Sequence, residues 1–268
     1  MLLAAVVRLE ALEEGYIEGG TGRDVHGLWF HQWKAVAPAW AERLHGGSGV
    51  KPFTLSPLLG LPRPRKGKQK VSPGDAAWFR VSTLQGELSR RLQEDWLPRL
   101  PDEISLAGLR WRVVGYTTSA EEHPWAGQVD AQVLADTCLL DRSPPESLRL
   151  QFLTPTTFHG SGGHLPFPLP DALVRSWLRR WQALGPVRLP DSLPELARER
   201  LLISSYRLVT VPAREGRRMT IGCVGRMTLR GVRLRPGERA AFHLLAAYAF
   251  YAGSGHRTTQ GLGMTRLR

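Results

Sequence analysis

The sequence has only two cysteines, and it lacks the ligand patterns of common metal enzymes. Cys138 and Cys223 are far apart, so a disulfide-dense scaffold is excluded. The chain contains no His-Glu-x-x-His, no Cys-x-x-Cys and no cluster of carboxylates that would hold magnesium. A Walker loop, a Rossmann fingerprint and a Gly-x-Ser-x-Gly elbow are also missing. We therefore expect no metal or other cofactor, and a serine hydrolase is disfavoured.

Long apolar runs and an amino-terminal leader are missing as well. No apolar stretch approaches the roughly 20 residues of a membrane span, and no basic, apolar, small-residue leader opens the chain. We expect a reduced, cytoplasmic protein that has no membrane partner.

Acidic residues are scarce, above all in the last quarter of the chain. The 268 residues include 36 Lys and Arg against 24 Asp and Glu, a net charge of +12. Residues 196–268 hold 14 Arg and only three acids, and residues 62–70 form a basic stretch that predicts a mobile loop. Such an excess favours a polyanion such as nucleic acid, although a solvated Arg-rich surface is the alternative. The candidates for phosphate contact are Arg63, Arg65, Lys66, Lys68, Lys70, Arg217, Arg218, Arg226 and Arg230.

Hydrophobic periodicity predicts the order strand, helix, strand, strand, helix, strand, and predicts it twice. The first set has strands at 2–9, 51–59, 76–81 and 109–117, a helix capped by Asp24 and broken by Pro38, and a helix over 82–97. The second has strands at 147–154, within 201–229 and at 261–267, and helices at 171–184 and 238–252. This is the split βαβ pattern. It predicts an α+β fold of two tandem ferredoxin-like (RRM-like) domains, 1–118 and 146–268, joined by a linker over 119–145. Each domain should be an antiparallel sheet with helices on one face, with Trp29, Trp33, Trp177 and Trp181 in the cores.

A glycine-rich segment near the carboxyl terminus is the most specific motif. Four glycines frame residues 253–263 without a single acid. Such a loop after a helix allows backbone amides to approach phosphate, and a helix cap with a tight turn is the alternative of about equal weight. Its candidates for phosphate contact are Gly253, Ser254, Gly255, His256, Arg257, Gly261 and Gly263. His159 and His164 flank a second glycine-rich stretch, where a polar loop is favoured over a metal site because no third ligand is evident.

In these motifs the chain resembles the sixth CRISPR-associated family of repeat-processing endoribonucleases, of the RAMP superfamily. The four glycines match its carboxyl-terminal signature of Gly-x-Gly, five residues and Gly-x-Gly. Residues 51–58 and 152–158 are similar to the family's strand after the first helical region and to the strand that opens its second domain. The resemblance implies tandem ferredoxin-like domains and metal-independent cleavage of CRISPR precursor RNA within repeats. The family chemistry implies attack by a 2′-OH, leaving a 2′,3′-cyclic phosphate and a 5′-hydroxyl.

The resemblance also indicates the catalytic residues. His45 precedes the strand at 51–58 by the spacing of the family's catalytic histidine, and Lys51 stands where some relatives keep a catalytic lysine. His45 ends a helix before Gly46 and Gly47, where the helix dipole favours the imidazolium form that suits a general acid, although a capping histidine is the alternative.

The position of the family's catalytic tyrosine holds Phe30, which cannot exchange a proton. We choose His26 as the general base, one turn earlier on the same helix face, with a structural histidine as the equally weighted alternative; His31 is the next candidate. In one continuous helix His26 and His45 would lie about 28 Å apart, so the pairing requires the chain to fold back near Pro38.

Two functions remain open at this point. The first is the metal-independent endoribonuclease, with the repeat RNA, in the form of a stem-loop, as partner. The second is a non-catalytic RNA-binding subunit of a CRISPR interference complex, which Phe30 favours and His45 with Lys51 disfavours. Beyond the repeat RNA, an interference complex and a second copy of the chain, in a homodimer, are the further candidate partners.

Overall fold

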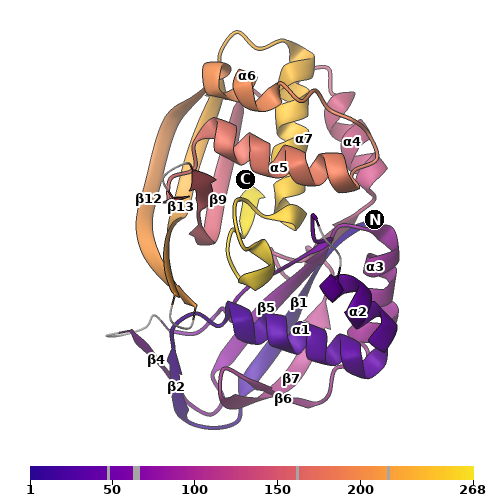
Figure 1. The fold of residues 1–268 in the computed structure, drawn as a ribbon, viewed down its shortest axis with the longest axis vertical. Helices are drawn as coiled ribbons and strands as arrows, with labels where there is room; N and C mark the ends of the chain where they lie inside the picture. Colours follow the sequence, from indigo (N-terminus) through magenta and orange to yellow (C-terminus); the bar gives the residue numbers. More distant parts are fainter. Residues whose placement is uncertain (47–48, 63–66, 161–162, 216–217) are drawn as a thin grey trace. The chain divides into compact units, whose positions relative to one another are not determined.

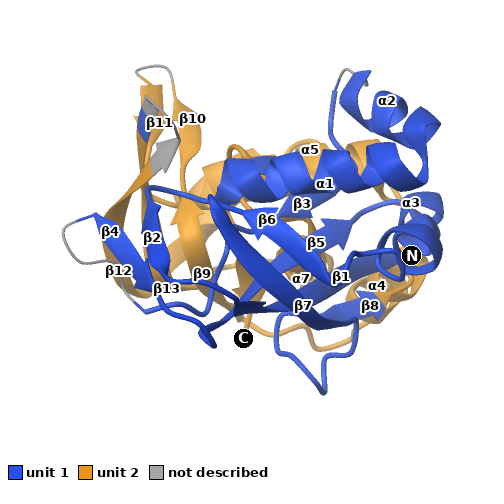
Figure 2. Ribbon diagram, turned by 90° about the horizontal axis from the view of Figure 1, so that it is seen from below, with its two compact units in different colours: residues 1–128, 214–219, 259–261 blue, residues 129–213, 220–258, 262–268 orange. Residues whose placement is uncertain are grey.

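The computed structural model describes residues 1–268 except 47–48, 63–66, 161–162 and 216–217. The chain divides into two compact units, and residues 1–128 and 129–213 form the main parts of unit 1 and unit 2 (Figure 2). Residues 214–219 and 259–261 group with unit 1, and residues 220–258 and 262–268 group with unit 2. The segment expected as a linker carries regular structure, namely β8 (Gly127–Val129) and α4 (Ala131–Leu139). In the part of the chain that the structure describes, no helix is long and apolar enough to cross a membrane.

Unit 1 is built on a six-stranded sheet with the strand order β3-β5-β1-β7-β6, and β8 pairs with β1. Its strands are β1 (Leu2–Ala11), β3 (Phe53–Leu55), β5 (Ala76–Thr83), β6 (Glu103–Leu106) and β7 (Leu109–Thr117). The helices α1 (Gly22–Val36) and α2 (Pro38–Gly46) connect β1 to β3, and α3 (Gly86–Arg91) with η1 (Leu92–Trp96) connects β5 to β7 through β6. A separate two-stranded sheet pairs β2 (Gly15–Glu18) with β4 (Lys68–Val71).

Unit 2 has a four-stranded sheet with the order β12-β13-β9-β14. The strands are β9 (Ser147–Thr156), β12 (Leu201–Glu215), β13 (Arg218–Gly231) and β14 (Thr265–Leu267). The helices are α5 (Pro170–Leu184), α6 (Leu193–Arg200) and α7 (Pro236–Ala252), followed by the short η2 (Thr258–Gln260) (Figure 1). A small hairpin of β10 (Phe158–Gly160) and β11 (Gly163–Leu165) stands between β9 and α5.

The two sheets have the same topology. When the four main strands of each unit are counted along the chain, both sheets read second, third, first, fourth: β3-β5-β1-β7 and β12-β13-β9-β14. This order, with helices after the first and the third strand, is that of a ferredoxin-like domain. The predicted fold class, two tandem ferredoxin-like domains of the α+β type, is confirmed.

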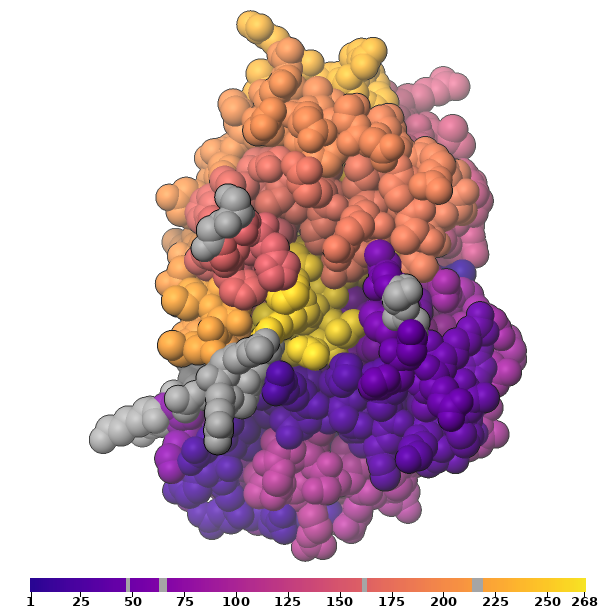
Figure 3. Space-filling view, viewed as in Figure 1, coloured from indigo at the N-terminus to yellow at the C-terminus, as the bar shows by residue number. Residues whose placement is uncertain are grey.

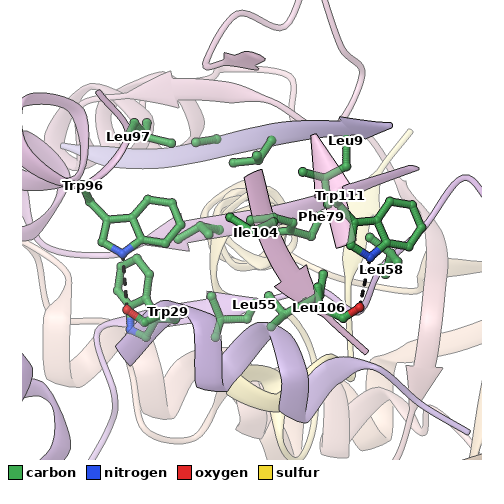
Figure 4. Close-up of a cluster of buried hydrophobic side chains, with 14 of the residues drawn as sticks. Leu9, Trp29, Leu55, Leu58, Phe79, Trp96, Leu97, Ile104, Leu106 and Trp111 are labelled. Atoms are coloured by element: carbon green, nitrogen blue, oxygen red, sulfur yellow. Dashed lines mark hydrogen bonds between the residues drawn. The ribbon is translucent and has the colours of Figure 1, made fainter. Parts of the chain in front are cut away.

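The core of unit 1 lies between the sheet and α1 (Figure 4). Alternate residues of β1 contribute to it, since successive side chains of a strand point to opposite faces. The indole of Trp96 donates a hydrogen bond to the carbonyl oxygen of Trp29, and that of Trp111 donates to Leu106. All four tryptophans predicted as core, Trp29, Trp33, Trp177 and Trp181, are fully buried.

Several elements differ from the sequence-based expectation for identifiable reasons. The strand expected over 51–59 is shortened to β3, because Pro52 and Pro57 flank it and lack backbone donors. The predicted cap Asp24 lies inside the first turn of α1, which begins at Gly22 after Thr21. The hydroxyl of Thr21 accepts a hydrogen bond from the amide of Leu58 instead of capping the helix.

Candidate functional site

A break between two helices brings the predicted catalytic histidines together. α1 ends at Val36, and the amide of Ala37 donates the last bond of the helix, to the carbonyl oxygen of Trp33. Ala37 adopts φ −157° and ψ 78°, outside the helical region, and the residue before a proline is disfavoured in that region. Pro38 then opens α2 as its first residue, where its missing N–H costs nothing. The chain therefore folds back where the pairing of His26 with His45 requires it.

The ring of Phe30 lies in contact with both histidines. The centroids of His26 and Phe30 are 4.9 Å apart, and those of Phe30 and His45 are 5.5 Å apart. Phe30 also packs edge-on against the buried ring of Phe53 in β3, at 5.9 Å. His26 is half-buried, whereas His45 is exposed in the last turn of α2. The site thus has an apolar centre with one sheltered and one exposed imidazole.

The surroundings of His26 favour its neutral form. Partial burial lowers its pKa below the ordinary value of a histidine, and the positive charges of His45, Lys51 and Arg23 lower the pKa further. A neutral imidazole accepts a proton, so the ring is suited to act as a base. His45, Lys51 and Arg23, which carry or can carry positive charge, thus lie near the imidazole of His26. Such a concentration of positive charge also attracts a phosphate.

Lys51 is tied to the end of α2. Its ammonium donates hydrogen bonds to the carbonyl oxygens of Leu44, at 2.9 Å, and of His45, at 3.0 Å. These carbonyls belong to the last turn, whose acceptors have no partner inside the helix. Lys51 therefore fixes the backbone that carries His45 and supplies a positive charge beside it.

Sequence reasoning missed Arg23, which lies one helical turn before His26 and affects its pKa. The (i, i+3) spacing on α1 was the available signal. His31 lies apart from the group of His26, Phe30 and His45. It lines a surface cavity with Leu28 and Gln32 of α1 and with residues around β6.

The glycine-rich segment of unit 2 is closed by internal hydrogen bonds. The amide of Ser254 donates to Gly263, that of Gly255 to the hydroxyl of Ser176, and that of His256 to Thr157. The hydroxyl of Ser254 is fully buried and accepts the indole N–H of Trp177 at 2.8 Å. In this conformation these amides and this hydroxyl bind the protein itself, in contrast to the expectation that they approach a phosphate.

Close packing explains the glycine signature. Gly253, Gly255, Gly261 and Gly263 all have positive φ. A Cβ on Gly255 would lie 2.1 Å from the carbonyl oxygen of Thr157, and one on Gly263 would lie 2.0 Å from that of Ser254. Only glycine fits both the torsion angles and the contacts. The side chains of His256 and Arg257 remain partly exposed, and atoms of the carboxyl-terminal segment reach the surface (Figure 3, yellow).

A buried arginine supports this segment from inside unit 2. Arg180 of α5 is 6% exposed and donates to the carbonyl oxygen of Gly255 and to the hydroxyls of Thr258 and Ser176. All three acceptors are neutral, and no acid of the described residues forms an ion pair with it. Burial, which outweighs the charge of Arg179, lowers the pKa of the guanidinium to about 10.

The predicted basic contacts fall into three groups. Lys68 and Lys70 of β4 pair with Glu18 at 2.6 Å and with Glu14 at 2.9 Å, so their charge is compensated locally. On β13, Arg230 pairs with Glu146 at 3.3 Å. Arg226 of the same strand is exposed, and its charge lowers the pKa of Arg266 in β14. Arg63, Arg65, Lys66 and Arg217 lie outside the described residues, as does the side chain of Arg218.

Comparison with known proteins gives matches over nearly the whole chain. The family model described as the CRISPR Cas6 N-terminal domain matches residues 2–136, and the model of the CRISPR-associated endoribonuclease Cas6 matches residues 150–265. The curated CRISPR-associated endoribonuclease Cas6 of Mycobacterium tuberculosis is 25% identical over 197 residues. That match covers 71% of this chain and 58% of the relative, so the chain spans little more than half the length of this protein.

Solved structures of the same family are similar over their full length. A Cas6 product complex superposes with a TM-score of 0.82 at 28% identity, covering 100% of both chains. A second Cas6 product complex has a TM-score of 0.78 at 31% identity, again covering 100% of both chains. The Cas6 of Thermus thermophilus is 27% identical, with a TM-score of 0.72 and coverage of 100% of this chain and 98% of its own. Two family models in tandem, together with this agreement in fold, show that the chain belongs to the Cas6 family of CRISPR-associated proteins.

Proposed function

We propose that the protein is an endoribonuclease that cuts CRISPR precursor RNA within its repeats and uses no metal. The observation that carries this proposal is the contact of His26 and His45 with one ring, Phe30. Two imidazoles in different environments can serve as base and acid in the same reaction. Membership of the Cas6 family supports the substrate, as do similar structures described as product and substrate mimic complexes.

In the proposed reaction, neutral His26 removes the proton of the ribose 2′-OH upstream of the cut. The 2′-oxygen attacks the adjacent phosphorus, and the bond to the 5′-oxygen breaks as protonated His45 gives that oxygen its proton. The products are a 2′,3′-cyclic phosphate and a 5′-hydroxyl. The low pKa of His26 supports its role as base, and the exposure of His45 allows it to reach the leaving oxygen.

Lys51 and Arg23 supply positive charge for the pentacoordinate phosphorus. The charge of each lowers the pKa of His26, so both lie close to the proposed base. Charges fixed in advance stabilise a developing anion without reorganisation. The ammonium of Lys51 is also held by two carbonyl oxygens, which makes it a positioning residue for His45 in addition to a cation.

RNA is proposed to be held in addition by two arginines, Arg226, which is exposed, and Arg257, which is partly exposed, with the ring of His256 beside Arg257. A double-stranded stem is recognised mainly through its phosphates and its shape. Lys68 and Lys70 contribute less, because each already has a carboxylate partner.

The decisive experiment is incubation with the cognate repeat RNA in excess EDTA, followed by analysis of the new ends. We expect cleavage that persists in EDTA, gives a cyclic phosphate and stops when the ribose at the cut carries hydrogen in place of its 2′-OH. Cleavage that requires magnesium, or cleavage of the deoxy substrate, would contradict the mechanism. Tight binding without cleavage would support the non-catalytic RNA-binding subunit, the function that Phe30 favours because its ring carries no exchangeable proton.

A further inference from the structure

A cavity in unit 2 is separate from the histidine pair of unit 1. It has a volume of about 340 Å³ and lies between the first turns of α5, the hairpin β10–β11 and the glycine-rich segment. Its apolar wall is formed by Phe158, Leu165, Leu169 and Ala172. Its polar side includes His159, Ser176, Arg179 and His256, and also Asp171 and Arg175, which pair with each other at 3.8 Å. The volume is at the lower end of the range for small-molecule sites, and an apolar wall with a few polar groups is typical of them.

Two histidines, His159 and His256, line this cavity, and the ring of His164 lies next to both of them. His159 and His164 are cross-strand neighbours in the β10–β11 hairpin, with ring centroids 5.0 Å apart. The ring of His256 lies 4.0 Å from that of His159 and 5.6 Å from that of His164. In the described part of the chain no group of His, Cys, Asp and Glu is arranged to hold a metal ion. The Nε2 atom of His256 instead accepts a hydrogen bond from Arg257, at 3.1 Å.

The rings are surrounded by positive charge. Burial, together with the charges of His159, Arg257, His164 and Arg179, lowers the pKa of His256 to about 4. Arg179 forms no ion pair with any described acid, whereas its neighbour Arg175 is held by Asp171 and Glu195, each at 3.8 Å. A bound anion would relieve this repulsion.

The buried Arg180 provides a second, independent sign of a missing anion. It lies beneath Gly255 and Ser176, both of which line the cavity, and its three acceptors are neutral. A cation that is out of water and without a counter-charge is costly for the folded protein. An anion bound in the cavity would offset part of this cost.

We propose that this cavity binds one unpaired nucleotide of the RNA, with its base against the apolar wall and the histidine rings and its phosphate at Arg179. Unstacked bases are commonly held by aromatic rings, including that of histidine. The inference rests on the proposed function only for the source of the nucleotide. The cavity takes no part in the chemical step.

The test titrates the full chain with adenosine and uridine 5′-monophosphate, and with inorganic phosphate as a separate probe. Binding is followed by calorimetry and by the NMR signals of the histidine rings. We expect at least one nucleotide to shift the signals of His159 and His256 and to bind at least tenfold more tightly than phosphate. Arg179→Ala removes a cation, and Ala172→Phe fills the cavity. Each variant should weaken nucleotide binding tenfold or more.

The matched control is Arg198→Ala, the loss of an exposed arginine on α6 that does not line the cavity, which should change the affinity less than twofold. Circular dichroism of each variant checks that it is folded. No shift at millimolar nucleotide, equal binding of phosphate, or an equal loss in Arg198→Ala would each overturn the proposal. The same variants are tested for cleavage of saturating repeat RNA, which should be unchanged. Nucleotide binding without RNA cleavage by the unmodified chain would refute the proposed function and leave the nucleotide site intact.

Discussion

The histidines of the two units stand on the same topology but in opposite surroundings. In unit 1, His26 and His45 contact the uncharged ring of Phe30, and the nearby cations are Lys51 and Arg23. In unit 2, His159, His164 and His256 contact each other and lie among arginines. The first arrangement places one half-buried and one exposed imidazole against the same ring, which suits the proposed proton transfer. The second concentrates positive charge on a cavity, which suits binding rather than proton transfer.

The difference comes from what is inserted between the first two strands of each domain. In unit 1 the insertion is a helix that breaks at Pro38, so that its second part returns to the first. In unit 2 the hairpin β10–β11 precedes the helix and brings two histidines to the glycine-rich segment. A shared fold can therefore carry two different candidate sites, because the side chains brought together depend on the insertions and not on the strand order.

The largest effect should come from the histidines of unit 1. We expect His45→Ala to lower the single-turnover rate of RNA cleavage by about a hundredfold or more, and His26→Ala to lower it to a lesser degree, with RNA affinity nearly unchanged. His31→Ala on the other side of α1 and His164→Ala in unit 2 serve as controls and should leave the rate unchanged. A loss of affinity equal to the loss of rate would make His45 a binding residue, and a slow His31→Ala would transfer the role of base to His31.

Unit 2 should instead respond in stability to loss of its buried charge. Arg180→Leu removes the donor from two buried acceptors, Gly255 and Thr258, and also removes an uncompensated buried charge; the loss of the hydrogen bonds should outweigh that gain, so we expect the free energy of unfolding to fall by about 2 kcal/mol. Arg226→Leu, at an exposed position of β13, should change it by less than about 0.5 kcal/mol. Urea unfolding of both variants gives the comparison. Equal values would mean that Arg180 does not stabilise the glycine-rich segment.

The pH dependence of cleavage should report on the lowered pKa of His26 in unit 1. Because the pKa of His26 is lowered, this base stays deprotonated to a lower pH than an ordinary histidine, and the rate should fall as the pH drops through the lowered pKa. Arg23→Gln removes one of the charges that lower this pKa, so the pKa should rise and the acid limb of the rate profile should move to higher pH. Arg90→Gln, on α3 and paired with Glu94, is the matched control. An acid limb that moves equally in both variants would exclude His26 as the titrating group.

The smallest effect concerns Arg226 and Arg257, the first exposed and the second partly exposed. Arg226→Ala with Arg257→Ala should weaken RNA binding and reduce the slope of log affinity against log salt by about one for each lost phosphate contact. Lys68→Ala should change the slope less, because Glu18 already compensates that charge. Binding is measured by filter retention over a series of salt concentrations. A slope unchanged in the double variant would mean that this Arg-rich surface is only solvated.

The sequence could predict the elements whose signals are local. Periodicity located the four main strands and the main helices of each domain, tryptophans at helical spacing predicted the cores, and Pro38 predicted the helix break. It could not predict β4, because this strand forms only by pairing with β2 over a long separation, which also gives Lys68 and Lys70 their acidic partners. The sequence predicted that His26 and His45 lie together only if the chain folds back near Pro38. The direction of the chain after Pro38 is set by the tertiary structure.

For the glycine-rich segment, the sequence by itself determined where glycine is required, because positive φ leaves little choice of residue. Only the tertiary structure decided what the segment does with its amides, which bind Ser176, Thr157 and Gly263. The same holds for His256, which the sequence left as a loop residue and which the fold places against His159 and His164. Torsion angles are local properties that a residue type can encode, whereas hydrogen-bond partners and neighbouring charges come from segments that meet only when the chain has folded.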